Sequence, residues 1–142
     1  MTDEPRDVED IDDELDDEPE ELTRTQLEYL HKRLTEERSN VKKRLERHLA
    51  EAVEDSDNLP DEMDIASRQS DQAYLLRLAD KEKKLLRMID HALAKFERGT
   101  YGICEGTDDP IGFKRLDLKP WARYSLEHQE QLEHEKGGRA RR

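Results

Sequence analysis

The chain has 142 residues, of which 44% are charged, 32% hydrophobic and 5% aromatic, and its formal net charge is −12. So polar a composition excludes a large compact core and favours an elongated helical protein with a disordered part. The sequence has no apolar run of the roughly 20 residues that cross a bilayer, no basic N-terminal signal and a single cysteine, Cys104. We therefore expect a cytoplasmic protein with no membrane segment and no internal disulfide.

The negative charge is concentrated at the N-terminus. Residues 1–22 contain thirteen acids and one base, whereas the remaining residues contain 24 acids and 24 bases. Self-repulsion and the scarcity of large apolar groups predict a disordered acidic tail over residues 1–22. Such a tail either keeps the protein soluble or imitates nucleic-acid charge and competes for basic surfaces on a partner. DNA is not expected as the main partner, because a phosphate backbone requires a basic face.

A long helix is predicted after this tail. Thr25-Gln26-Leu27-Glu28 has the pattern of a capping box, in which the side chains of Thr25 and Glu28 bond free amides of the first turn. Apolar residues at spacings of three, four and seven then form one stripe: Leu27, Leu30, Leu34, Val41, Leu45, Leu49 and Val53. Over residues 50–64, Pro60 and several turn-forming residues predict a connection.

A second helix is predicted to follow and to end at Gly99. Its apolar positions are Tyr74, Leu75, Leu78, Leu85, Met88, Ile89, Leu93 and Phe96. Two helices of similar length joined by a short loop are expected to pack as an antiparallel coiled-coil hairpin. We assign this hairpin to residues 23–98, a rod about 45 Å long with its tip at residues 55–66.

Residues 99–125 predict a small globular module. Residues 101–104 and 111–113 are typical of a hairpin of short strands, and Leu116, Leu118, Trp121 and Tyr124 supply an apolar cluster. Residues 126–142 predict a helix from Leu126 to Lys136, capped by Ser125 and stopped by Gly137-Gly138, and then a basic tail. The expected fold class is therefore mainly α.

Four residues of the module have the spacing of a zinc site. Cys104 and Thr107 form one x2 pair, Ser125 and His128 form another, and seventeen residues separate the pairs. Structural zinc takes four sulfur or nitrogen ligands, and only Cys104 and His128 provide them. We therefore expect no metal and no other cofactor there, with Cys104 as a half-buried packing residue and His128 on a helix surface.

The tip of the rod carries the pattern Asp61-x2-Asp64-x-Ala66. As purely structural residues, Asp64 would cap the second helix and Asp61 would form a turn. Alternatively, carboxylates at the end of a stiff rod suit the delivery of charge into a narrow basic or metal-bearing channel. The sequence contains no catalytic motif, which predicts that the protein is not an enzyme, and its five histidines are expected to be solvated.

These features resemble the DksA/TraR family of bacterial transcription factors. The resemblance spans roughly residues 25–136 and rests on the tip pattern, the long return helix and the segment Gly99-Thr100-Tyr101-Gly102-Ile103-Cys104, followed by Ile111-Gly112, Arg115-Leu116 and Pro120. It implies a monomer that binds bacterial RNA polymerase through the secondary channel and destabilises promoter open complexes. The two tip aspartates and the alanine, which are functional in the family, correspond to Asp61, Asp64 and Ala66.

The sequence departs from the family in its module and in its contacts with the alarmone ppGpp, a frequent co-effector. The family has four zinc cysteines, of which only Cys104 remains, so the chain looks like a zinc-independent variant with a zinc-ribbon-like module. Leu85 and Lys119 match the family's ppGpp contacts, but Met88 and Gln129 stand where basic residues are expected. Fewer charge-assisted phosphate contacts predict weaker ppGpp binding.

Two other functions fit the residues. In the first, the protein would act like the Gre transcript-cleavage factors, with its tip acids holding a second Mg²⁺. In the second, the hairpin would be a structural adaptor with an inert tip. A cleavage assay on backtracked RNA tests the first, and recovery of RNA polymerase from a bacterial lysate tests the second.

Overall fold

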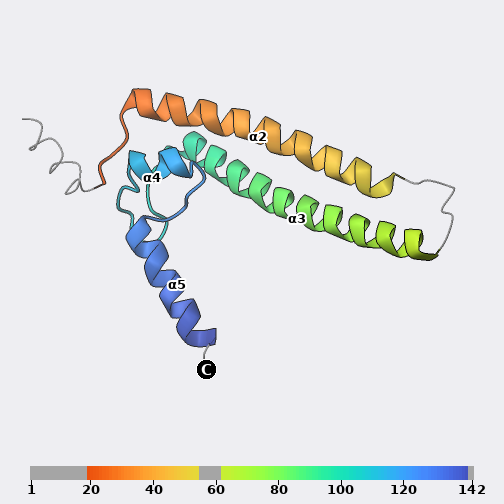
Figure 1. Ribbon diagram of the computed structural model, residues 1–142. Helices are drawn as coiled ribbons and strands as arrows, with labels where there is room; N and C mark the ends of the chain where they lie inside the picture. The colour runs from red at the N-terminus through yellow and green to blue at the C-terminus, as the bar shows by residue number, and fades with distance from the viewer. Residues whose placement is uncertain (1–18, 55–61, 141–142) are drawn as a thin grey trace, which may run out of the picture.

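The computed structural model describes residues 19–54 and 62–140, which form four helices. These are α2 (Arg24–Val53), α3 (Glu62–Arg98), the short α4 (Phe113–Leu118) and α5 (Leu126–Ala140). Figure 1 shows α2 and α3 side by side as a long antiparallel rod, with α4 at its base and α5 projecting away. The predicted mainly α fold with a helical hairpin is thereby confirmed. None of the described helices is both long and apolar enough to span a membrane.

The rod is held by a narrow apolar stripe on each helix. On α2, Leu30, Leu34 and Val41 are fully buried, and on α3 the same holds for Ile89. Three predicted stripe residues are instead largely exposed: Val53 (74%), Tyr74 (55%) and Met88 (43%). Small side chains explain the difference, because Ala52, Ala79 and Ala92 occupy buried positions in the rod, and the pattern of large apolar residues does not include them.

Hydrogen bonds define both ends of α2. Its N-cap is Thr23, whose hydroxyl accepts from the Gln26 amide, while the Gln26 side chain accepts from the Thr23 amide. The predicted box at Thr25 and Glu28 is therefore wrong by two residues, since glutamine also serves at the third helical position. At the other end, α3 side chains donate to the last carbonyls of α2, with Arg68 bonded to Glu54 and Gln72 to Ala52.

The module contains less β-structure than predicted. Its expected hairpin is one antiparallel bridge between Ile103 and Pro110, with no strand among the described residues. The chain turns at Gly112, whose φ is 95°, and then forms α4, which the sequence did not indicate. Leu118, predicted in the apolar cluster, is 86% exposed at the end of α4.

The C-terminal helix is longer than predicted. Ser125 caps it as expected, because its hydroxyl accepts from the His128 amide at 3.3 Å. The helix continues through Gly137-Gly138 to Ala140. A glycine inside a helix costs only about 1 kcal/mol relative to alanine, so two glycines do not oblige a helix to stop.

One apolar core joins the module to the base of the rod. Leu30 and Ile89 belong to the same buried cluster as Tyr101, Cys104 and Leu116. The Tyr101 ring stacks on Phe96 with centroids 4.0 Å apart, and its hydroxyl donates to the Pro120 carbonyl at 2.8 Å. The module is thus fixed to α3 by packing that begins directly after the helix ends.

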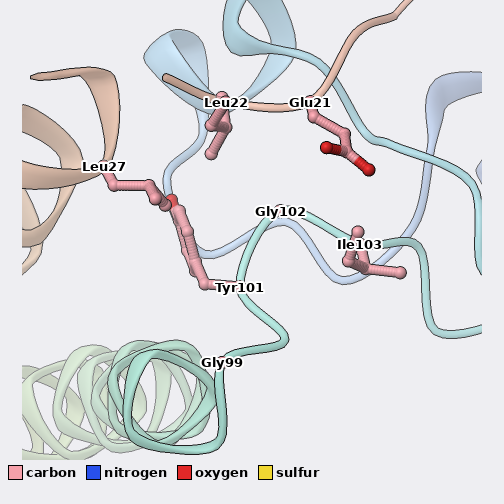
Figure 2. A pocket seen from close by; sticks show the side chains of 7 residues that line it. All are labelled: Glu21, Leu22, Leu27, Gly99, Tyr101, Gly102 and Ile103. Carbon is pink, nitrogen blue, oxygen red and sulfur yellow. The ribbon is translucent and has the colours of Figure 1, made fainter. Parts of the chain in front are cut away.

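The segment before α2 lies against this module. Leu22 packs on Gly102, where an added Cβ would lie 2.9 Å from Leu22 Cδ1, and Pro19 lies over Gly112. Figure 2 shows Leu22 beside Tyr101 and Gly102 at a cavity of about 210 Å³. These residues are the end of the predicted tail, and they pack on folded structure; residues 1–18 lie outside the described part of the chain.

Candidate functional sites at the two ends of the rod

The first candidate site is the tip of the rod. Asp64 and Ala66 lie in the first turns of α3, and both are exposed. Asp64 is the third residue of that helix, so it does not occupy the N-cap position that its structural interpretation required. Asp61 lies outside the described residues. Asp64 and Ala66 therefore stand at the start of a helix, where backbone amides point toward the end of the rod.

Hydrogen bonds between α2 and α3 fix the positions of the two helices near the tip. Because Arg68 and Gln72 bond the final carbonyls at the end of α2, the first three turns of α3 are tied to the end of its neighbour. Val53 and Ile65 flank the tip and are 74% and 39% exposed. The end of the rod thus presents both charged and apolar side chains to a partner.

The second candidate site is in the module, at the other end of the rod. The structure brings its four zinc-spaced positions together. The Cys104 sulfur accepts hydrogen bonds from the Thr107 hydroxyl and from the amides of Gly106, Thr107 and Ser125. Ser125 in turn bonds the amide of His128. Cys104, Thr107, Ser125 and His128 therefore lie together as a small cluster, although His128 was expected on a helix surface.

The environment of Cys104 favours a thiolate. Its side chain is fully buried rather than half-buried. Burial raises the pKa of the thiol, but the hydroxyl of Thr107 and the surrounding amides lower it, and the resulting pKa is about 7. Hydrogen-bond donors around a sulfur stabilise its charged form.

His128 closes the cluster by packing and is not a surface histidine. Its ring lies so near Gly106 that an added Cβ there would be 2.1 Å from His128 Nε2. The ring centroid is 5.2 Å from that of Tyr124. Its Nδ1 atom is buried and has no hydrogen-bond partner in the described part of the chain. The imidazole therefore fills space between the start of α5 and the turn after Cys104.

These donors do not match a structural zinc site. Tetrahedral zinc in such modules takes four thiolate or imidazole ligands, and this cluster offers one thiol, one imidazole and two hydroxyls. Among the described residues, no group of three or more His, Cys, Asp or Glu side chains is arranged to hold a metal ion.

An ionic cluster that the sequence did not predict lies beside this site. Glu105 receives hydrogen bonds from Arg123 (3.0 and 3.1 Å), and its Oε2 lies 2.9 Å from His91 Nε2 and 3.5 Å from Lys95 Nζ. Lys95, only 5% exposed, also donates to the Ile103 carbonyl. Glu105 therefore links the module to two side chains on one face of α3.

The charged groups around Glu105 lower the pKa of its carboxyl group. Partial burial opposes ionisation of Glu105, but the hydrogen bonds from Arg123 and His91 and the positive charges of Lys95 and Arg123 lower its pKa to about 2. The spacing of His91 and Lys95, four residues apart, indicated a shared helix face. Their acidic partner depends on how the chain reverses after Gly99, which no local pattern specifies.

Two further histidines make contacts within the rod and its base. His48 Nδ1 lies 2.9 Å from Glu82 Oε2 across the hairpin, and its side chain is only 14% exposed. His31 packs edge-on against Phe96 at a centroid distance of 4.9 Å. His48 therefore departs from the expected solvation, whereas His31 is exposed as expected and also contacts an aromatic ring.

The two residues compared with ppGpp contacts belong to different parts of the fold. Leu85 is half-buried within α3, fourteen residues before Gly99, whereas the exposed Lys119 directly follows α4 in the module. Met88 and Gln129, which replace expected basic residues, are on α3 and α5. No hydrogen bond or ion pair between described residues joins Leu85 to Lys119.

Two family models cover most of the chain. The model described as "DnaK suppressor protein DksA, N-terminal domain" matches residues 26–96, and "Prokaryotic dksA/traR C4-type zinc finger" matches residues 99–134. The first corresponds to the rod and the second to the module and most of α5.

Similar proteins agree with these matches. The chain is 37% identical over 108 residues to the RNA polymerase-binding transcription factor DksA of Caulobacter vibrioides, covering 76% of each chain. It is 29% identical over 101 residues to the Escherichia coli K12 protein of the same name, covering 71% of this chain and 67% of the relative.

The fold has a similar solved structure, transcription factor DksA2 from Pseudomonas aeruginosa. The TM-score is 0.72 at 37% identity, over 80% of this chain and 87% of that one. Sequence and structure thus agree over both the rod and the module, and the chain belongs to the DksA/TraR family.

Proposed function

We propose that this protein binds bacterial RNA polymerase and regulates transcription by inserting its rod through the secondary channel. The observation that carries the proposal is the combination of a family relationship to RNA polymerase-binding factors with a rod whose far end exposes Asp64 and Ala66. A thirty-residue α2 gives a rod about 45 Å long, which can carry a tip far from the surface on which the module rests.

The tip acts by contact and performs no catalysis. Asp61 and Asp64 add negative charge near the catalytic Mg²⁺ of the polymerase and compete for the polar groups that surround it. Ala66 keeps the helix surface narrow beside them. Altered contacts in that region lower the stability of the promoter open complex.

ppGpp binding is expected to be weak in this protein. Leu85 and Lys119 remain as contacts, but Met88 and Gln129 cannot supply charged bonds to phosphate. Each charge-assisted hydrogen bond is roughly twice as strong as a neutral one, so two lost bonds reduce affinity substantially. We therefore expect the protein alone to change transcription more than the addition of ppGpp changes it further.

The test is in vitro transcription from a promoter with an unstable open complex. We expect Asp64→Asn to weaken the effect of the protein at least about tenfold, because one hydrogen bond to a charged group contributes about 1.5–3 kcal/mol and about 1.4 kcal/mol is a factor of ten. Binding to polymerase should change little, since most of the contact area lies elsewhere. Asp71→Asn, an exposed acid further along α3, is the matched control and should behave as wild type.

The same preparation separates the alternatives. Transcription that responds equally to the wild type and to Asp64→Asn contradicts a role for the tip. Stimulated cleavage of backtracked RNA indicates the Gre-like function, and failure to recover polymerase with the full-length protein indicates an adaptor.

A further inference from the structure

The middle of the rod carries a concentrated positive charge. Residues 41–47 of α2 and 81–87 of α3, together called the basic collar, contain eight cations and two acids. The two segments are adjacent, because Arg44 and His48 both contact Glu82, at 3.3 and 2.9 Å. Outside the collar, residues 19–142 contain 24 acids and 16 bases. The collar is therefore a basic band on an otherwise acidic body.

Most of the collar cations are available to a partner. Seven are exposed: Lys42, Lys43, Arg47, Lys81, Lys83, Lys84 and Arg87. None of these seven forms an ion pair with another residue of the described ranges, whereas the eighth, Arg44, bonds Glu82 and Glu37. Like charges so close together repel one another, which favours an acidic occupant.

The chain itself supplies such an occupant. Residues 1–18 contain eleven acids and one base, a net charge of −10. Their attachment point is fixed, because Pro19 lies over Gly112 and Leu22 over Gly102 in the module. The acidic segment therefore starts at the base of the rod.

The acidic segment is long enough to reach the collar. Lys84 precedes Gly99 by fifteen residues, which corresponds to about 22 Å along α3. An eighteen-residue chain has a root-mean-square span of about 24 Å if flexible and reaches about 60 Å if extended. Covalent attachment gives an effective concentration in the millimolar range, so weak individual contacts suffice.

We propose that residues 1–18 bind the basic collar of their own chain and mask it electrostatically. The interaction is a competitive one: a partner surface that offers stronger negative charge displaces the segment. If the rod enters the polymerase channel as proposed above, the collar lies on the part that enters, and the acidic segment weakens that association. This last consequence rests on the proposed function, whereas the masking does not.

The masking is tested by NMR on the full-length protein. The comparison is between wild type and a tail variant in which all eleven acids of residues 1–18 become Asn or Gln. We expect amide shift differences at residues 41–47 and 81–87 in about 50 mM salt that disappear near 500 mM, because salt screens exposed charges. No difference at the collar, or differences confined to residues 137–142, would overturn the proposal.

Two further variants make the test specific. In a collar variant (Lys81→Gln, Lys84→Gln, Arg87→Gln), which removes three of the eight cations, neutralising the tail should cause clearly smaller shifts. In a matched control that changes three exposed cations elsewhere (Lys32→Gln, Arg98→Gln, Lys136→Gln), the collar shifts should persist. Shifts that vanish on dilution would show binding between copies and contradict the intramolecular contact.

Polymerase binding is a separate measurement. We expect the tail variant to bind polymerase at least about threefold more tightly than wild type at low salt, with equal affinities at high salt. If neither protein binds polymerase, the proposed function fails while the NMR result still decides the masking. If both bind equally at low salt and the collar shifts are absent, the masking fails while the proposed function stands.

Discussion

Glu105 joins the module to the rod through side chains from three parts of the chain. It contacts His91 and Lys95 of α3 and Arg123, which follows α4. An isolated surface ion pair contributes little, but several charges that share one carboxylate form a network. Because Lys95 is buried, removing its acidic partner leaves a cation with fewer compensating contacts.

We predict that Glu105→Gln lowers the free energy of unfolding at neutral pH by about 1–2 kcal/mol, allowing for solvent screening of a partly exposed group. Folding lowers the pKa of Glu105 to about 2, below its ordinary value of about 4.3. The stabilisation is therefore complete above about pH 5 and is lost as the pH falls toward 2.

Denaturant unfolding at neutral pH and near pH 3 checks this prediction. The difference between wild type and Glu105→Gln should shrink at the lower pH. Glu97→Gln, an exposed acid near the end of α3, is the control and should leave stability unchanged. Equal losses for both variants at neutral pH would contradict a specific role for Glu105.

The sequence identified neighbouring residues of the site where a short motif contains them. The spacing of Cys104, Thr107, Ser125 and His128 marked four positions that lie together in the structure, although His128 was expected on a helix surface. The Glu105 cluster was missed because its members are 10 to 18 residues from Glu105 and meet only through tertiary packing. Local spacing carries no information about such partners.

At the scale of elements, the segment before α2 forms part of the module. Leu22 packs on Gly102, a glycine with a φ of 89°, and belongs to the partly buried apolar side chains around the core. Only glycine adopts that backbone conformation without strain. The close approach of Leu22 and the positive φ together explain why the residue at this turn is glycine.

We predict opposite effects of alanine at two glycines. Gly102→Ala should lower stability by about 1–3 kcal/mol, because it adds backbone strain and a Cβ 2.9 Å from Leu22 Cδ1. Gly137→Ala lies in α5 with no atom within 4 Å of the added Cβ, and it should raise helix stability by up to about 1 kcal/mol. Thermal unfolding followed by circular dichroism measures both, and a neutral Gly102→Ala would contradict the packing argument.

Long elements were predictable and short ones were not. The rod follows from a repeated apolar spacing over some thirty residues, and its ends differ from prediction by only a few residues. The six-residue α4 has too few residues for a periodic signal, and it begins only because the chain turns at Gly112. Similarly, the predicted β-hairpin reduces to one bridge, because the chain turns at Gly112 and α4 begins at Phe113, the last residue of the predicted second strand.

In the whole molecule, polar contacts attach the module to both helices of the rod. Asp117 of α4 accepts from Arg33 at 2.9 Å and from Tyr29 at 3.2 Å, both on α2, while Glu105 contacts α3. Within the module, the buried Cys104 accepts hydrogen bonds from its neighbours, and the half-buried His128 packs against Gly106. These contacts supply the cross-links that zinc would otherwise provide, so the fold should not depend on metal.

We predict that removal of metal by a chelator leaves the unfolding temperature of the wild-type protein unchanged and that purified protein contains no stoichiometric zinc. The variant Thr107→Cys, Ser125→Cys, His128→Cys restores four thiols at converging positions. It should bind one zinc and become sensitive to chelation, because structural zinc contributes directly to folding. Elemental analysis and thermal unfolding with and without chelator compare the two proteins. Loss of wild-type stability on chelation would contradict this prediction. In that case Cys104 and His128 would have to hold the ion together with the hydroxyls of Thr107 and Ser125.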